Sequence, residues 1–195
     1  MPRLCTFAVA AVAASVLAIL PGSATAQKGW YEKAVKKVEG KFTPAEAKPG
    51  QTVTFTLTVE LNDGYHTYPT AQPDKAAEGM NNVIKFPAPG AVVFVGETED
   101  PKDYLTKAEP DIGIKELRYN TGTVVYTRKA VVSPKAKAGA AKVELANFSL
   151  SVCDKSNCFP PKKVPVEATL KVLDGPPVEV EKAYAGEVAK ALEGK

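Results

Sequence analysis

The chain is poor in the residue types that build metal sites. Its 195 residues include three cysteines, one histidine and two methionines, one of which is Met1. Two thiolates without further ligands do not complete the tetrahedral set of a zinc site, and His66 is distant from the cysteines in sequence. Copper(I) held by two thiolates is the remaining metal interpretation, and no Met-rich tract supports it. We therefore expect no metal and no other cofactor.

The chain also lacks a large surplus of one charge, and beyond its N-terminus it lacks long apolar runs. Lys and Arg number 25 and Asp and Glu 22, and the lysines are scattered among the acidic residues without a basic stripe. Nucleic acid is therefore not expected as a partner. Beyond the first 20 residues, no run is long and apolar enough to cross a bilayer. The sequence contains no internal repeat and no low-complexity tract.

The N-terminus has the order of a secretory signal peptide. Arg3 precedes a mostly apolar run over residues 4–20, and the small residues Ala24-Thr25-Ala26 follow. This order predicts cleavage after residue 26 and export to the periplasm or the outside, with no membrane span left after cleavage. The competing interpretation is a retained anchor, for which the run is somewhat short. Cys5 would leave with the signal, so Cys153 and Cys158 remain, in a compartment where disulfides persist.

The rest of the chain predicts an all-β domain over residues 27–174. In residues 52–61, five apolar side chains alternate with threonines and Glu60, which is typical of a strand with one buried face. Residues 97–113 show no usable period and are expected to form a long surface loop, and residues 28–40 fit a helix or an edge strand equally well. The fold class predicted is an immunoglobulin-like antiparallel β-sandwich with a short C-terminal helix. The other expected strands cover residues 83–86, 91–96, 123–132, 143–152 and 164–172.

Residues 175–195 form a separate tail in this prediction. Val180, Tyr184, Val188 and Leu192 recur every fourth residue among Glu, Lys and Ala, which predicts a short amphipathic helix. We expect this helix to pack on the sandwich rather than to bind a partner.

The two remaining cysteines are separated by four residues between strand-like segments. Alternation that buries Phe148, Leu150 and Val152 would send Cys153 to the opposite, solvent-facing side. An accessible pair suits thiol–disulfide exchange. The alternative is a permanent staple in a non-catalytic, exported immunoglobulin-like module that binds proteins. A staple closing so short a loop contributes only about 2 kcal/mol to stability, and the spacing alone does not choose between the two.

Two motifs carry a resemblance to a known family. Gly64-Tyr65-His66-Thr67-Tyr68 follows a Thr/Val strand, and Cys153 and Cys158 stand in a Cys-x4-Cys-x-Pro-Pro pattern. Together they resemble the N-terminal periplasmic domain of the thiol:disulfide interchange protein DsbD, over roughly residues 35–173. The resemblance implies an immunoglobulin-like sandwich that carries reducing equivalents through the couple Cys153/Cys158, and in a catalytic role a protein-disulfide reductase type of activity.

The resemblance also implies partners and a residue that covers the site. The expected partners are thioredoxin-fold periplasmic proteins, including those of cytochrome maturation, and a separate membrane electron donor. Tyr119, expected on a loop before the strand over residues 123–132, is the candidate for the family's aromatic cap, with an ordinary half-buried tyrosine as the alternative. His66 is expected to be structural. The x4 spacing is one residue shorter than in the best-known members, which changes the geometry of the loop.

Overall fold

A four-stranded antiparallel sheet forms one layer of the molecule. The computed structural model describes residues 29–193, and in it this sheet has the order β1-β3-β9-β6. Alternate side chains of β3 are buried along its whole length, so one face of this strand lies against the core. Its partners flank it in antiparallel register over nearly their full length. The strands are β1 (Val35–Thr43), β3 (Thr52–Leu61), β9 (Thr123–Val132) and β6 (Val92–Glu99).

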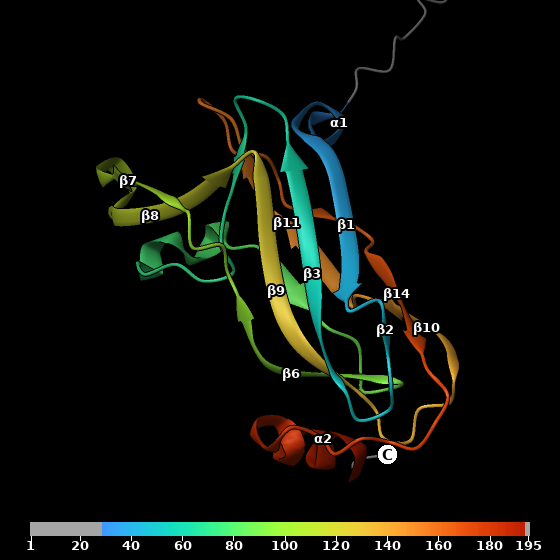
Figure 1. Cartoon of the computed structure of the whole chain (residues 1–195). Helices are drawn as coiled ribbons and strands as arrows, with labels where there is room; N and C mark the ends of the chain where they lie inside the picture. Colours follow the sequence, from blue (N-terminus) through green and yellow to red (C-terminus); the bar gives the residue numbers. More distant parts are fainter. Residues whose placement is uncertain (1–28, 194–195) are drawn as a thin grey trace, which may run out of the picture.

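Two three-stranded sheets, β10-β14-β2 and β13-β11-β5, lie behind the first layer (Figure 1). All of their strand pairs are antiparallel except β14 with β2, which is parallel. The space between the layers is filled by apolar residues from both, including Phe55 and Leu57 of β3 and Phe148 and Leu170 from the second layer. The strands are β10 (Gly139–Glu144), β14 (Glu167–Val172), β2 (Glu46–Ala47), β13 (Lys162–Lys163), β11 (Asn147–Leu150) and β5 (Val83–Lys85).

A fourth sheet, β12-β4-β8-β7, extends from one side of the sandwich. Figure 1 shows β7 and β8 as a hairpin that projects away from the two layers. Two short 3-10 helices, Lys75–Met80 and Pro110–Ile112, accompany this sheet. The strands are β12 (Val152–Cys153), β4 (His66–Thr67), β8 (Ile114–Thr121) and β7 (Leu105–Glu109).

Two α-helices complete the structure. α1 (Trp30–Ala34) leads directly into β1, so the ambiguous N-terminal segment holds both a helix and an edge strand. α2 (Lys182–Glu193) packs Val188 against Val93, Val95 and Val131 on the outer side of the first sheet. The predicted fold class, an immunoglobulin-like sandwich with a short C-terminal helix, is confirmed. The predicted signal peptide lies outside the described residues, and neither helix within residues 29–193 has the length and hydropathy of a membrane span.

Two expectations about single segments are wrong. The predicted surface loop over residues 97–113 contains the end of β6, the strand β7 and a 3-10 turn. β7 gave no periodic signal because its side chains are exposed or only partly buried on both faces. The single strand predicted over residues 143–152 is divided among β10, β11 and β12, which belong to three different sheets.

Candidate functional site

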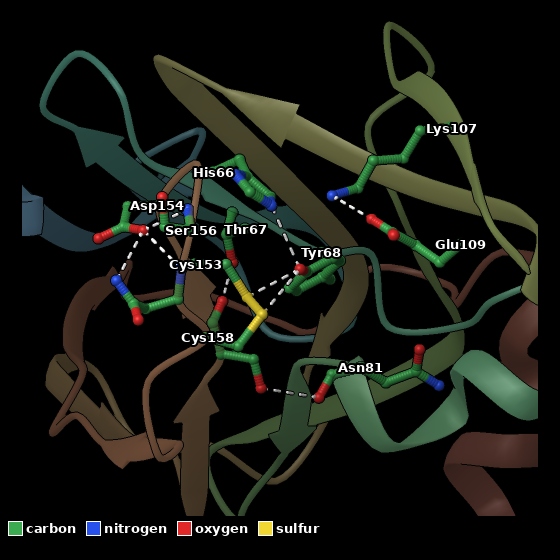
Figure 2. Close-up of a disulfide and its surroundings, with 12 residues drawn as sticks. His66, Thr67, Tyr68, Asn81, Lys107, Glu109, Cys153, Asp154, Ser156 and Cys158 are labelled. Atoms are coloured by element: carbon green, nitrogen blue, oxygen red, sulfur yellow. Dashed lines mark hydrogen bonds and ion pairs between the residues drawn. A yellow bond between two sulfur atoms is a disulfide. The ribbon is translucent and has the colours of Figure 1, made fainter. Parts of the chain in front are cut away.

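Cys153 and Cys158 form a disulfide at one end of the fourth sheet (Figure 2). β12 carries Cys153 and pairs with β4, so that Cys153 lies opposite His66. The four residues between the cysteines form a tight turn. The carboxylate of Asp154 accepts hydrogen bonds from the backbone N–H groups of Ser156 and Asn157, each at 2.7 Å. These bonds hold the pKa of Asp154 below its usual range. The loop therefore has a fixed shape while the disulfide is closed.

The two cysteines differ in exposure. Cys158 is exposed, whereas only 3% of Cys153 is accessible. The prediction that Cys153 faces solvent is therefore wrong. Its side chain does leave the main core, as the alternation required, but the fourth sheet covers that side. Cys153 packs there in a second apolar cluster with Tyr68, Ala77, Ile114 and Leu117.

The chain leaves one sheet and enters another at Ser151, two residues before Cys153. The backbone N–H of Ser151 donates to Oδ1 of Asn82 at 2.7 Å, and its carbonyl accepts from the hydroxyl of Thr67 at 2.7 Å. Side chains thus satisfy the two backbone groups that a neighbouring strand would otherwise bind. The chain passes at this point from β11, which pairs with β5 and β13, to β12, which pairs with β4.

Tyr68 is the side chain in closest polar contact with the disulfide. Its hydroxyl donates to Sγ of Cys153 at 2.9 Å and lies 3.7 Å from Sγ of Cys158. Nε2 of His66 lies 3.2 Å from the same hydroxyl. Burial raises the pKa of Tyr68 to about 12. The phenol therefore keeps its proton at neutral pH and can donate it to a sulfur.

Tyr68 is fixed through its backbone as well as its ring. Its carbonyl accepts from the side-chain amide of Asn82 at 2.6 Å and from the hydroxyl of Tyr126 at 2.6 Å. The same amide also approaches the hydroxyls of Thr67 and Tyr126, at 2.9 and 2.7 Å. This buried network connects the site to β9 in the first sheet, so the core of the sandwich determines the position of the Tyr68 hydroxyl.

His66 separates the disulfide from an open cavity of about 560 Å³. The residue is 9% exposed, and burial lowers its pKa, with a further lowering by the positive charge of Lys107. The ring of Tyr119 lies edge-on to His66 with 5.0 Å between centroids. The cavity is lined mainly by polar and charged residues from four segments: Asn62, Asp63, Gly64, Tyr65, His66, Lys107, Tyr119, Thr121, Gly122, Asp154 and Lys155.

Tyr119 does not lie on a loop as predicted. It is a half-buried residue of β8, paired with Leu105 of β7. It packs against the cluster that contains Cys153, and Nζ of Lys107 lies 5.6 Å from its ring centroid. Tyr119 therefore covers the buried side of the site next to His66. The structure therefore places the candidate cap in a paired strand beside His66, and not on a loop.

Aromatic side chains gather around Phe159, the residue that follows the exposed Cys158. Phe159 follows Cys158, and the ring of Trp30 stacks on it at 5.3 Å between centroids with a 6° interplanar angle. Tyr65 lies 6.3 Å from Phe159, also between centroids. Nζ of Lys162 lies 4.2 Å above the ring of Tyr31. A pocket of about 80 Å³ beside the two sulfurs is lined by residues that include Tyr68, Met80 and Pro161.

The contacts of His66 and Tyr68 could not be derived from sequence distance. Both belong to the Gly-Tyr-His-x-Tyr segment that the sequence singled out, but they are more than 80 residues from the cysteines. The pairing of β4 with β12 brings them together. Within residues 29–193, no group of three or more His, Cys, Asp or Glu side chains is arranged to hold a metal ion.

Comparisons with known proteins give no family. No protein-family model matches the sequence, and no curated protein matches it significantly. Among solved structures, BcpA, the major pilin subunit of Bacillus cereus, is similar at a TM-score of 0.38 and 9% identity, over 69% of this chain and 40% of the pilin. A cohesin–dockerin complex from Clostridium thermocellum gives a TM-score of 0.37 and 15% identity, over 70% of this chain and 99% of the matched one. The seventh ScaB type I cohesin from Pseudobacteroides cellulosolvens gives a TM-score of 0.36 and 11% identity, over 74% of this chain and 94% of the cohesin. Likeness at these TM-scores does not bear on the function of this chain.

Proposed function

We propose that this protein is an exported thiol–disulfide exchange protein that uses the couple Cys153/Cys158. The observation that carries the proposal is the asymmetry of the pair, in which an exposed Cys158 is bonded to a buried Cys153. Exchange requires one sulfur that a partner can reach and a second that attacks from within the protein. A hydroxyl hydrogen-bonded to the buried sulfur, as Tyr68 is to Cys153, stabilises negative charge when that sulfur is released.

The proposed reaction runs through a mixed disulfide. In the dithiol form, the thiolate of Cys158 attacks a partner's disulfide, and one partner sulfur leaves with the electron pair of the broken bond. Cys153 then attacks Sγ of Cys158 and releases the second partner sulfur. The partner gains two electrons, and the protein returns to the disulfide form. The resemblance to the DsbD domain suggests thioredoxin-fold acceptors and a membrane protein as the electron donor.

The surface around Cys158 supports contact with a protein partner. Trp30, Tyr65 and Phe159 are half-buried aromatic residues beside the exposed cysteine, and Lys162 lies at their edge. Tryptophan and tyrosine supply much of the binding energy in protein interfaces. A partner that approached Cys158 would meet these rings first.

Single cysteine variants test this function. Cys153→Ser leaves Cys158 free to form a mixed disulfide that nothing resolves, so it should trap exported thioredoxin-fold proteins. Cys158→Ser is the matched control and should trap far less, because its remaining thiol is buried. A redox titration of the unaltered protein should give a reduction potential above about −300 mV. Structural bridges, which resist reduction by glutathione, have potentials below about that value. A lower potential, together with no trapping by either variant, would contradict the exchange function.

The second candidate is a non-catalytic, exported immunoglobulin-like module with a permanent bridge. The observation that favours it is the packing of Cys153 among Tyr68, Ile114 and Leu117, where the sulfur serves as part of a small core. In this case the couple would stay oxidised under every reductant of the exported compartment. The same titration therefore separates the two candidates.

A further inference from the structure

A continuous line of polar contacts connects the buried sulfur to the open cavity. The Tyr68 hydroxyl donates to Sγ of Cys153 at 2.9 Å, and Nε2 of His66 lies 3.2 Å from the same oxygen. His66 in turn lines the cavity of about 560 Å³. Figure 2 shows His66 and the disulfide on opposite sides of the Tyr68 hydroxyl. No other residue joins Cys153 to that cavity by side-chain hydrogen bonds among the contacts of the described chain.

We propose that His66 and Tyr68 form a proton relay for Cys153, in which Tyr68 exchanges the proton with the sulfur and His66 exchanges it with the cavity. The inference rests on the proposed exchange function and adds to it the path of the proton. Tyr68 touches a reacting atom. His66 does not touch the sulfur and acts only through Tyr68. It orients the Tyr68 hydroxyl and exchanges a proton with it.

The relay is needed when Cys153 resolves a mixed disulfide. Burial in apolar surroundings disfavours a thiolate, so the attacking thiol has to lose its proton as it reacts. The proton passes from Cys153 to the oxygen of Tyr68 while the Tyr68 proton passes to Nε2 of His66. The sulfur of Cys153 bonds to Sγ of Cys158, and the partner sulfur leaves with the electron pair of the broken bond. His66 becomes an imidazolium and loses a proton to the cavity.

The electrostatics of the site suit these roles. Burial raises the pKa of Tyr68 to about 12, so Tyr68 passes a proton on without remaining ionised. Burial, and then Lys107, lower the pKa of His66, so its ring is neutral near neutral pH and has a lone pair to offer. Asp154 and Glu109 oppose this lowering. The charged or titratable groups around His66 are Asp63, Tyr65, Tyr68, Lys107, Glu109, Tyr119, Cys153, Asp154 and Lys155.

The reduced protein can be tested with 5,5′-dithiobis(2-nitrobenzoate) in a stopped-flow instrument. Each molecule should release two thionitrobenzoate ions. The first reports the attack of Cys158 on the reagent, and the second reports the attack of Cys153 on the mixed disulfide. In the unaltered protein, the rate of the second release should rise with pH through the titration of His66 and then level off. In His66→Gln it should be about 100-fold slower at neutral pH, the lower end of general-base effects, and the levelling should disappear.

Four further variants test against a purely structural explanation. Tyr68→Phe should slow the second release as much as His66→Gln, and the double variant should be no slower than either single one. Lys107→Gln removes a positive charge and should move the rise to higher pH, whereas Asp154→Asn removes a negative charge and should move it to lower pH. A protein that merely lost packing would show no such opposite displacement.

The outcomes distinguish a failure of the proton relay from a failure of the proposed thiol–disulfide exchange. If the first release fails in the unaltered, folded protein, Cys158 does not exchange, and the function and the relay fall together. If both releases occur but the second is insensitive to His66→Gln and to the two charge variants, exchange stands and the relay is wrong.

Discussion

At the scale of single residues, Tyr68 connects the stability of the fold with its chemistry. Only 1% of its surface is exposed, its carbonyl is held by Asn82 and Tyr126, and its hydroxyl contacts Cys153. A buried polar network of this kind stabilises a protein when every member is satisfied and is costly when one partner is removed. The residues that fix Tyr68 therefore also fix the environment of the sulfur.

His66 should make the stability of the protein depend on pH. Burial and Lys107 lower its pKa, so the folded protein resists protonation where the unfolded chain, with an ordinary value near 6.5, accepts a proton. The unfolded state then binds more protons, and the free energy of unfolding falls as the pH falls through about 6.5. Urea unfolding at several pH values should show this loss in the unaltered protein and a weaker one in His66→Gln. Equal losses in both proteins would contradict the prediction.

Asn82 should be among the most sensitive polar positions. Its side chain contacts Thr67, Tyr68 and Tyr126, and it accepts from the backbone of Ser151. Asn82→Ala should lower the free energy of unfolding by about 3 kcal/mol, because several buried groups lose their partners together. Asn81→Ala is the matched control, since Oδ1 of Asn81 has no hydrogen-bond partner among the described residues. Equal urea midpoints for the two variants would show that the network contributes less to the free energy of unfolding than its geometry suggests.

At the scale of elements, the sequence predicted best the long strands that bury one face in the main core. Residues 52–61 and 123–132 were predicted at the bounds of β3 and β9, because alternate side chains of both strands enter the main core. β7 was missed because neither of its faces is fully buried. The predicted solvent exposure of Cys153 was wrong because Tyr68, Ile114 and Leu117 cover the side opposite the main core. The chain reaches this second cluster through the hydrogen bonds of Ser151 to Asn82 and Thr67, where it passes from one sheet to another. Such bonds join residues about 70 and 84 positions apart, beyond the reach of local periodicity.

The packing of α2 gives a prediction at the same scale. Val188 is 3% exposed and contacts the valines of β6 and β9. Val188→Ala removes two methyl groups from this contact and should destabilise the protein by about 2 kcal/mol. Lys190→Ala, an exposed change on the same helix, should alter stability by less than about 0.5 kcal/mol. Urea unfolding followed by circular dichroism measures both, and a separate early transition for the helix would contradict a single cooperative unit.

At the scale of the whole molecule, the sandwich has a core that does not depend on the bridge. The main cluster contains residues of both layers, whereas the disulfide spans only four intervening residues at one end. The fold and the bridge are therefore separable, which the proposed redox couple requires.

Reduction of the bridge should leave the protein folded and less stable by about 2 kcal/mol, the chain-entropy value for a loop of this length. Guanidinium unfolding of the oxidised and the reduced protein gives the difference directly. The double variant Cys153→Ser/Cys158→Ser should resemble the reduced form. A reduced protein that does not fold would favour the permanent bridge of the second candidate.

The stack of Trp30 on Phe159 has a practical consequence. Trp30 is the only tryptophan of the chain, and its stacking partner is bonded directly to Cys158. We expect reduction of the bridge to release the segment that holds Phe159 and so to change the polarity around the indole. The emission spectrum of the unlabelled protein should therefore report the opening and closing of the bridge, with Trp30 as an intrinsic fluorescent indicator.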